Sequence, residues 1–292
     1  MTEHPNRRDP RAARAWDVHY EDGPIRTVVT GLQATEPLQA QEAMRLRLVL
    51  ADRGVVILPG QAVTGEQQAR FNASFGPVEL SNMQAFPDAV HRNIVRLSNQ
   101  ADGTDFAHYW HMDASSRFRP TTVSSLHAVA VPEGTPTSTM FLSAALAYDG
   151  LPLGLLRRLN GLKWIVGERT RAPILRAHPL TNRPLLWLPL RFERCSGSDA
   201  ELRAMLDRLN GGIRPRIEDV GEAECEALMF MLIRHLTSRP EWIYEHTWSP
   251  GDLVLWDQST VYHRAGTTDD RLILHRTAVR GDPAVPFSPP TV

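Results

Sequence analysis

Cysteine and lysine are the residues that this sequence has least of. Cys195 and Cys225 are the two cysteines, and they stand far apart in no C-x-x-C pair. A disulfide framework or a zinc ribbon therefore has no support, and reduced thiols, as in a cytoplasm, are expected. Lys163 is the single lysine, so arginine supplies nearly all of the positive charge. Since the formal net charge is only −1, the composition gives no sign of a nucleic-acid or anionic-membrane partner.

Long apolar runs are absent as well. No stretch approaches the roughly 20 apolar residues that a membrane-spanning helix needs. The segment 1–10 is polar and lacks the apolar run of a signal peptide. These absences predict a cytoplasmic protein without a membrane partner. We expect residues 1–15, which are polar and arginine-rich, to be a flexible N-terminus. Residues 16–292 are expected to form one domain, because elaborated β-barrels of this size are common.

Hydrophobic periodicity predicts helices and strands in irregular alternation. The predicted helices span 38–51, a segment that starts at the capping box 64–67, 143–160 with a break at Pro152, 199–209 and 222–236. The predicted strands span 55–58, 121–131, 242–246 and the residues from 253 onward. Strands flanked by helices, without a regular βαβ alternation, argue against a doubly wound sheet. The predicted fold class is therefore mainly β with helices (α+β), a double-stranded β-helix (jelly-roll, cupin-like) core with helical insertions.

Two histidines and an aspartate form an H-x-D…H pattern, made by Trp110-His111-Met112-Asp113 and, 150 residues after Asp113, by His263. An H-x-D pair alone is weak evidence, because His111 is also explained as a polar residue at a strand edge. Spacing by two nevertheless puts His111 and Asp113 on one face of a strand, and His263 follows the short apolar run 252–257. Two imidazoles and one carboxylate on one face of a metal make the facial triad of non-haem Fe(II) oxygenases. We therefore predict these three residues as metal ligands and catalytic residues.

Several segments of the chain occur in the order, and near the spacing, of a known family. They are Arg53–Gln61, Phe75–Val78, Trp110–Asp113, Ala147–Pro152, Trp256–Asp257 and His263–Ala265. Over roughly residues 45–283, the chain resembles the taurine dioxygenase / 2,4-dichlorophenoxyacetate dioxygenase family of Fe(II)- and 2-oxoglutarate-dependent oxygenases. The resemblance implies that His111, Asp113 and His263 bind Fe(II), with 2-oxoglutarate as cosubstrate and O2 as oxidant.

Two further positions are implied to bind 2-oxoglutarate. The family carries a threonine about 28 residues after the first histidine, which matches Thr139. The preceding residues 136–138 differ from the Gly-Gly-Asp that the family usually has there. Arg276, thirteen residues after His263 in a strand-like run, can meet the far carboxylate of a 2-oxo acid bidentately. An alternative alignment of the last strand moves this role to Arg271.

Substrate-binding residues are predicted with alternatives open. Family members often carry a second arginine four residues beyond the first, which matches Arg280, on the strand face of Arg276; a solvated strand-end arginine explains Arg280 equally well. Arg117 would face the pocket mouth and bind an anionic substrate, or be a solvated loop residue. His108 would border the pocket or lie in a loop. The segment 80–86 has neither His nor Tyr where taurine dioxygenase carries its sulfonate-binding pair, which argues against taurine.

The resemblance implies an enzyme, a 2-oxoglutarate-dependent dioxygenase that hydroxylates an aliphatic C–H of a small, anionic substrate, with succinate and CO2 as co-products. Asp113 favours hydroxylation, because related halogenases have a small residue there. The alternative with the same cofactors is a tailoring oxygenase in amino-acid or nucleotide natural-product biosynthesis. An alternative from another class is a non-catalytic jelly-roll binding module. A homo-oligomer stays open, since family members are often dimers or tetramers.

Overall fold

The computed structural model describes residues 16–21, 23, 25–80, 93–100, 105–113, 121–166 and 170–281. Arg117, which the sequence suggested as a substrate residue, lies outside the described residues. Within these ranges, none of the helices combines the length and the apolar character that crossing a membrane requires.

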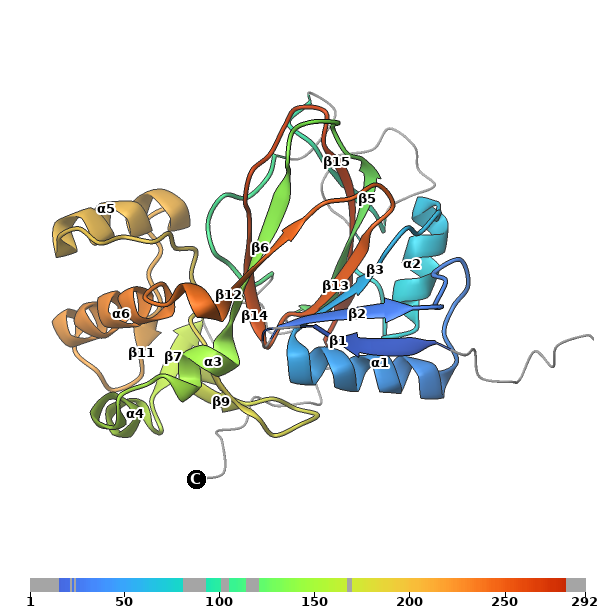
Figure 1. Ribbon diagram of the computed structural model, residues 1–292. Helices are drawn as coiled ribbons and strands as arrows, with labels where there is room; N and C mark the ends of the chain where they lie inside the picture. The colour runs from blue at the N-terminus through green and yellow to red at the C-terminus, as the bar shows by residue number, and fades with distance from the viewer. Residues whose placement is uncertain are drawn as a thin grey trace, which may run out of the picture.

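Two sheets form the centre of the molecule (Figure 1). The larger has seven strands, which in spatial order are β1 (Asp17–Tyr20), β2 (Arg26–Thr30), β3 (Val55–Leu58), β13 (Leu253–Asp257), β5 (Thr121–Ala130), β15 (Ile273–Arg280) and β4 (Val95–Leu97). The smaller has three strands, which in spatial order are β12 (Ile243–Thr247), β6 (Ser138–Ser143) and β14 (Val261–Ala265). Every neighbouring pair is antiparallel except β2 with β3.

The larger sheet is buried on both faces at β13. Helices α1 (Ala40–Arg53) and α2 (Gly65–Ala73) pack on one face, and α2 starts at the predicted capping box. On β13, Leu253 and Leu255 belong to the apolar cluster shared with these helices. Val254 and Trp256 belong to a second cluster, which includes Phe141 of the smaller sheet. This alternation follows from the period of two in a strand, and it places the second cluster between the two sheets.

A long helical insertion separates β6 from β12, and so Asp113 from His263. Its elements are α3 (Ala144–Asp149), α4 (Leu153–Leu159), β7 (Lys163–Val166), β8 (Thr170–Pro173), β9 (Leu175–Ala177), β10 (Pro184–Leu186), α5 (Asp199–Asn210), β11 (Arg216–Ile217), α6 (Glu222–Leu236) and the 3₁₀ turn η2 (Pro240–Trp242). Figure 1 shows α4, α5 and α6 gathered on the side opposite α1 and α2. The apolar cluster of this insertion also contains Trp110, Met112 and Tyr262, which are chain neighbours of the predicted metal ligands.

Most predicted elements are present within a few residues. The strand 55–58 and the helix 222–236 match the predicted bounds. The strand predicted through His111 and Asp113 is wrong, because Trp110 and His111 form only isolated bridges and Asp113 lies in a turn. The backbone N–H of Asp113 donates to a side chain, that of Gln258, rather than to a strand partner.

Candidate metal centre

The backbone pairs the two predicted histidine ligands directly. The N–H of His111 donates to the carbonyl of His263 at 3.1 Å, and the N–H of His263 donates to the carbonyl of His111 at 2.9 Å. This exchange brings the two imidazole centroids to 4.1 Å. His263 lies on β14 opposite Phe141 of β6, and Trp110 is bridged to Phe192 of the insertion. The smaller sheet and the insertion together therefore fix the position of both rings.

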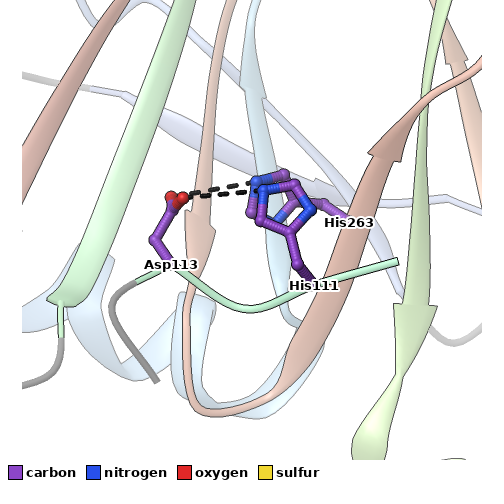
Figure 2. A group of neighbouring side chains, drawn as sticks. All are labelled: His111, Asp113 and His263. Atoms are coloured by element: carbon purple, nitrogen blue, oxygen red, sulfur yellow. Dashed lines mark ion pairs between the residues drawn. The ribbon is translucent and has the colours of Figure 1, made fainter. Parts of the chain in front are cut away.

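Asp113 completes a group of three potential ligands (Figure 2). Its Oδ1 lies 3.7 Å from Nε2 of His111, and its Oδ2 lies 3.8 Å from Nε2 of His263. One ligand atom from each residue lies within 4.8 Å of the others. Among the described residues no other group of three or more His, Cys, Asp or Glu side chains lies close enough together to hold a metal.

The two histidines differ in what their Nδ1 atoms contact. Nδ1 of His111 is 3.0 Å from the carbonyl oxygen of Tyr109, to which it would donate. That bond fixes the tautomer in which Nε2 carries the lone pair, as is usual for metal-binding histidines. The Nδ1 of His263 is buried and has no hydrogen-bond partner among the described residues. The ring of His263 is held instead by Trp256, whose ring centroid is 4.8 Å away.

The electrostatics of the group suit a divalent cation. Burial lowers the pKa of His111, and burial together with the neighbouring His111 lowers the pKa of His263 well below its ordinary value. Burial alone would raise the pKa of Asp113, but the Arg276 guanidinium holds it well below its usual range. Neutral imidazoles and an ionised carboxylate are the protonation states that bind metal. The donor set of two nitrogens and one oxygen fits the facial triad of Fe(II).

Two residues that the sequence did not single out contact Asp113. Gln258 bonds both its backbone N–H and its carboxylate, and the Ser124 hydroxyl donates to the carboxylate at 3.2 Å. Gln258 directly follows the matched pair Trp256–Asp257, which was the one signal available. Nothing in the sequence pairs residue 258 with residue 113, because the contact depends on how the turn after β13 folds.

The two candidate arginines for 2-oxoglutarate lie in different environments. Arg276 on β15 is 20% exposed, and its Nη2 lies 2.7 Å from Oδ2 of Asp113. Arg271 precedes β15, is 62% exposed and pairs with Asp269 at 2.9 Å. The structure thus brings Arg276 to the triad and leaves Arg271 in a surface turn.

Thr139 lies on β6, two residues before Phe141. Since Phe141 pairs with His263 across the sheet, Thr139 and His263 share one face of the smaller sheet. The Thr139 side chain is buried, and its Oγ1 accepts a hydrogen bond from Nε1 of Trp248 at 3.1 Å. Its hydroxyl proton therefore remains to be donated to another acceptor.

The predicted substrate residues are not gathered at the triad. His108 is exposed, and its nearest polar contact is the Thr268 hydroxyl at 3.5 Å. Two other arginines stand over the rings that flank His111. Arg191 lies over Tyr109 at 5.2 Å, and Arg264 lies over Trp110 at 5.8 Å. Besides the predicted Arg276, these two arginines therefore add positive charge near the centre.

Arg280 lies away from Arg276 despite the spacing of four. The register between β15 and β5 shifts between Val279 and Arg280. The regular pairing of β15 with β5 therefore ends just before Arg280. Arg280 is exposed and lines a surface groove with Glu66 and Arg70 of α2. The structure therefore does not bring Arg280 to the metal centre.

Comparison with known proteins agrees with this geometry. The family model described as "Taurine catabolism dioxygenase TauD, TfdA family" matches residues 21–278. The α-ketoglutarate-dependent 2,4-dichlorophenoxyacetate dioxygenase of Cupriavidus pinatubonensis is 29% identical over 267 residues, 82% of this chain and 88% of that protein. Pentalenolactone F synthase of Streptomyces arenae is 26% identical over 295 residues, 90% of this chain and 95% of that protein.

A solved structure shows the same overall likeness. The crystal structure of a taurine dioxygenase from Burkholderia xenovorans superimposes with a TM-score of 0.71 and 25% sequence identity, covering 91% of each chain. The family match spans far more than half of the sequence. The chain therefore belongs to the TauD/TfdA family of α-ketoglutarate-dependent dioxygenases, which use Fe(II), 2-oxoglutarate and O2.

Proposed function

We propose that this protein hydroxylates an aliphatic C–H bond of a small, anionic substrate in a reaction that consumes 2-oxoglutarate and O2 and releases succinate and CO2. The observation that carries the proposal is the convergence of His111, Asp113 and His263, with one donor atom from each within 4.8 Å of the others. Such a triad leaves three metal positions open, enough for a chelating 2-oxo acid and O2.

The proposed roles follow from the contacts. His111, Asp113 and His263 would hold Fe(II), which when bound supplies the activation of O2 for C–H oxidation. Arg276 would bind the far carboxylate of 2-oxoglutarate. A guanidinium has five N–H donors, so Arg276 can contact Asp113 through one nitrogen and the cosubstrate through others. Thr139 would donate its hydroxyl proton to the same carboxylate, because its Oγ1 already accepts a hydrogen bond from Trp248 and its proton is still free to donate.

An anionic substrate is supported by the charges around the triad. Arg191 and Arg264 lie over the aromatic neighbours of His111, and acidic substrates would be attracted there. His108 would stand at the edge of the site. The 2,4-dichlorophenoxyacetate named in one relative is such an anion. The protein's partner is then a small molecule rather than a macromolecule.

A tailoring reaction in natural-product biosynthesis is the second candidate. The similarity to pentalenolactone F synthase over most of both chains favours it. Measuring succinate release with a panel of sulfonates, aryloxyalkanoates, amino acids and nucleoside monophosphates would separate the two candidates. Substrate-dependent turnover with the first two classes supports a catabolic enzyme, and turnover with the last two supports a tailoring enzyme.

We further propose that the two central sheets form a double-stranded β-helix and that the chain from residue 16 onward is one domain. The apolar cluster between β13 and the smaller sheet supports this, because it gives the two sheets a common core. The insertion shares its cluster with Trp110 and Tyr262, so it has no separate core. The sparse cysteines favour a cytoplasmic location.

The proposed centre is tested by anaerobic titration of Fe(II) into metal-free protein with 2-oxoglutarate. The expected result is a visible metal-to-ligand charge-transfer band, lost in His111→Ala and weakened in Arg276→Ala, with Arg271→Ala as the matched control. Metal binding without O2-dependent 2-oxoglutarate consumption would instead identify a non-catalytic binding module.

A further inference from the structure

Three hydrogen-bond donors converge on a single oxygen of Asp113. Oδ2 lies 2.5 Å from Nε2 of Gln258, 2.7 Å from Nη2 of Arg276 and 3.2 Å from Oγ of Ser124. Oδ1 receives no hydrogen bond among the described residues. The two carboxylate oxygens are thus in unequal surroundings, although both are similarly close to the histidine nitrogens.

Gln258 is placed so that its amide has only one workable orientation. Its Oε1 accepts from the backbone N–H of Asp113 at 3.0 Å, while its Nε2 donates to Asp113 Oδ2 and to Ser124 Oγ at 2.8 Å. A flipped amide would turn its oxygen toward the carboxylate and its NH2 toward an N–H. Gln258 is 3% exposed and Ser124 is fully buried, and the Gln258 backbone N–H donates to Thr122 at 2.8 Å. The donors are therefore fixed before any metal binds.

We propose that Gln258 is a positioning residue that makes Asp113 a one-oxygen ligand. Together with Ser124 and Arg276 it occupies the acceptor sites of Oδ2 and leaves Oδ1 for the metal. A carboxylate oxygen has about two lone-pair sites, so a metal at Oδ2 would have to displace buried donors. The proposal rests on the proposed function, because one-oxygen binding is what keeps three positions free for 2-oxoglutarate and O2.

Loss of Gln258 has different consequences for metal and 2-oxoglutarate binding, depending on what Gln258 does. If Gln258 only fastens the turn at Asp113, its loss weakens metal binding and every later step alike. If it restricts Asp113 to one oxygen, its loss lets both oxygens bind the metal and fill one of the three positions that 2-oxoglutarate and O2 must share. The gained ligand atom then offsets the lost orientation of Asp113, so metal affinity stays close to that of wild type. 2-Oxoglutarate binds more weakly, because it competes with the second Asp113 oxygen for the open positions.

The experiment compares Gln258→Met and Ser124→Ala with wild type and with Gln68→Met. Gln68 is a matched control, because it is another buried glutamine, bonded to Ser125 of the same strand at 3.1 Å. Anaerobic calorimetry first measures Co(II) binding to metal-free protein, and then 2-oxoglutarate binding to the Co(II)-loaded protein. Thermal unfolding of each variant establishes that it is folded.

We expect the 2-oxoglutarate dissociation constant to rise about 10-fold or more in Gln258→Met, the lower end of what the loss of an outer partner of a metal ligand costs in metal affinity or activity. The rise in Ser124→Ala should be smaller, because its hydrogen bond to Asp113 is the longest of the three. The Co(II) dissociation constant should stay close to that of wild type, and Gln68→Met should change neither constant. Parallel loss of Co(II) and 2-oxoglutarate binding, or unchanged 2-oxoglutarate binding, overturns the proposal. If Gln258→Met does not fold, the same two outcomes are judged on Ser124→Ala. Wild-type protein that binds Co(II) but no 2-oxoglutarate would contradict the proposed function instead.

Discussion

Arginine and carboxylate side chains pair in two contrasting places in this molecule. In the metal centre, Arg276 and Asp113 meet 2.7 Å apart, with side chains only 20% and 15% exposed. In the insertion, Arg203 of α5 pairs with Glu226 of α6, and the arginine is 46% exposed. The two carboxylates are similarly shielded, at 15% and 19% exposed, whereas the arginine between the two helices is far more open to solvent than Arg276.

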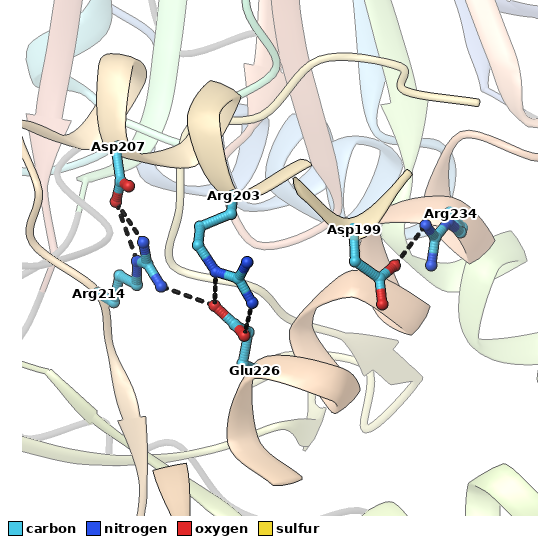
Figure 3. A network of polar contacts seen from close by, with 6 residues as sticks. All are labelled: Asp199, Arg203, Asp207, Arg214, Glu226 and Arg234. Atoms are coloured by element: carbon cyan, nitrogen blue, oxygen red, sulfur yellow. Dashed lines mark hydrogen bonds and ion pairs between the residues drawn. The ribbon is translucent and has the colours of Figure 1, made fainter. Parts of the chain in front are cut away.

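The insertion network is spread over several residues (Figure 3). Arg214 bonds Asp207 at 2.6 Å and Glu226 at 2.7 Å, so that Glu226 joins two arginines. Arg234 of α6 reaches Asp199 at the start of α5, at 2.7 Å. Exposed pairs of this kind contribute little, because water screens the attraction and ordering long side chains costs entropy.

The two carboxylates differ in whether a lost hydrogen-bond partner can be replaced by water. Water that reaches the exposed Arg203 can replace a partner that Glu226 loses. The donors around Asp113 converge on one atom, and two of them, from Gln258 and Ser124, are buried. Removing a partner from a buried charge leaves it unpaired, which is far more costly than losing an exposed pair. We therefore expect function to depend on single residues in the centre, and the stability of the insertion to depend on its apolar core.

The largest effect is expected from His263→Ala. It removes one of three ligands, so the affinity for Fe(II) should fall by more than the about 10- to 100-fold that loss of an outer partner costs, and 2-oxoglutarate consumption should cease. Anaerobic equilibrium dialysis with metal analysis measures the first, and succinate release the second. His108→Ala, at an exposed histidine, is the control and should retain Fe(II) binding. Full metal binding by His263→Ala would remove His263 from the ligand set.

A large loss of stability is expected from Leu228→Ala on α6. Leu228 is fully buried in the insertion cluster, and such truncations cost about 2–5 kcal/mol through lost burial and the cavity left behind. Urea unfolding measures this change. Met231→Ala, at a 40% exposed position of the same helix, should have little effect. Equal effects at both positions would mean that the insertion does not depend on this core.

An intermediate effect is expected from Arg276→Met. Hydrogen bonds to charged groups contribute about 1.5–3 kcal/mol, so the 2-oxoglutarate dissociation constant should rise by about 10- to 100-fold. Arg271→Met should leave that constant unchanged, because Arg271 is exposed and paired with Asp269. Calorimetry on Co(II)-loaded protein measures both. The reverse result would transfer the 2-oxoglutarate role to Arg271.

Sequence patterns were sufficient where local periodicity decides the structure. The helix 222–236 and the strand 55–58 follow from apolar spacing, and the H-x-D…H pattern brought together His111, Asp113 and His263. The remaining features of the site depend on pairing between segments that are distant in the sequence. The irregular path of His111 to Asp113 depends on single bridges to Phe192 and His263, which no local pattern encodes.

Two non-local features show this limit most clearly. Arg280 lies next to a register shift against β5 and lines a groove beside α2, a surrounding that counting four residues from Arg276 did not indicate. Gln258 reaches Asp113 across 145 residues of chain. In the sequence Gln258 looks like any other polar turn residue, because its contact with Asp113 exists only in the folded protein. Residues that contact the candidate metal were therefore predictable by type and spacing, whereas the residues that orient them were not.

The smallest effect is expected from Glu226→Gln. Hydrogen bonds from Arg203, and the charges of Arg203 and Arg214, lower the pKa of Glu226 below its ordinary 4.5. The contribution of ionised Glu226 to the free energy of unfolding is therefore present above about pH 4.5 and is lost as the pH falls through the lowered pKa. In urea unfolding, Glu226→Gln should cost much less than Leu228→Ala on the same helix, and the difference from wild type should shrink in about 0.5 M salt.

A double-mutant cycle with Arg203→Met isolates the coupling between Arg203 and Glu226 from their other contacts. The coupling should be small and should fall with salt, because the Arg203 side chain is 46% exposed and water reaches the pair. A large coupling that resists salt would mean that Glu226 behaves as a buried carboxylate does. The contrast with Asp113 would then lie in the number of converging donors rather than in exposure.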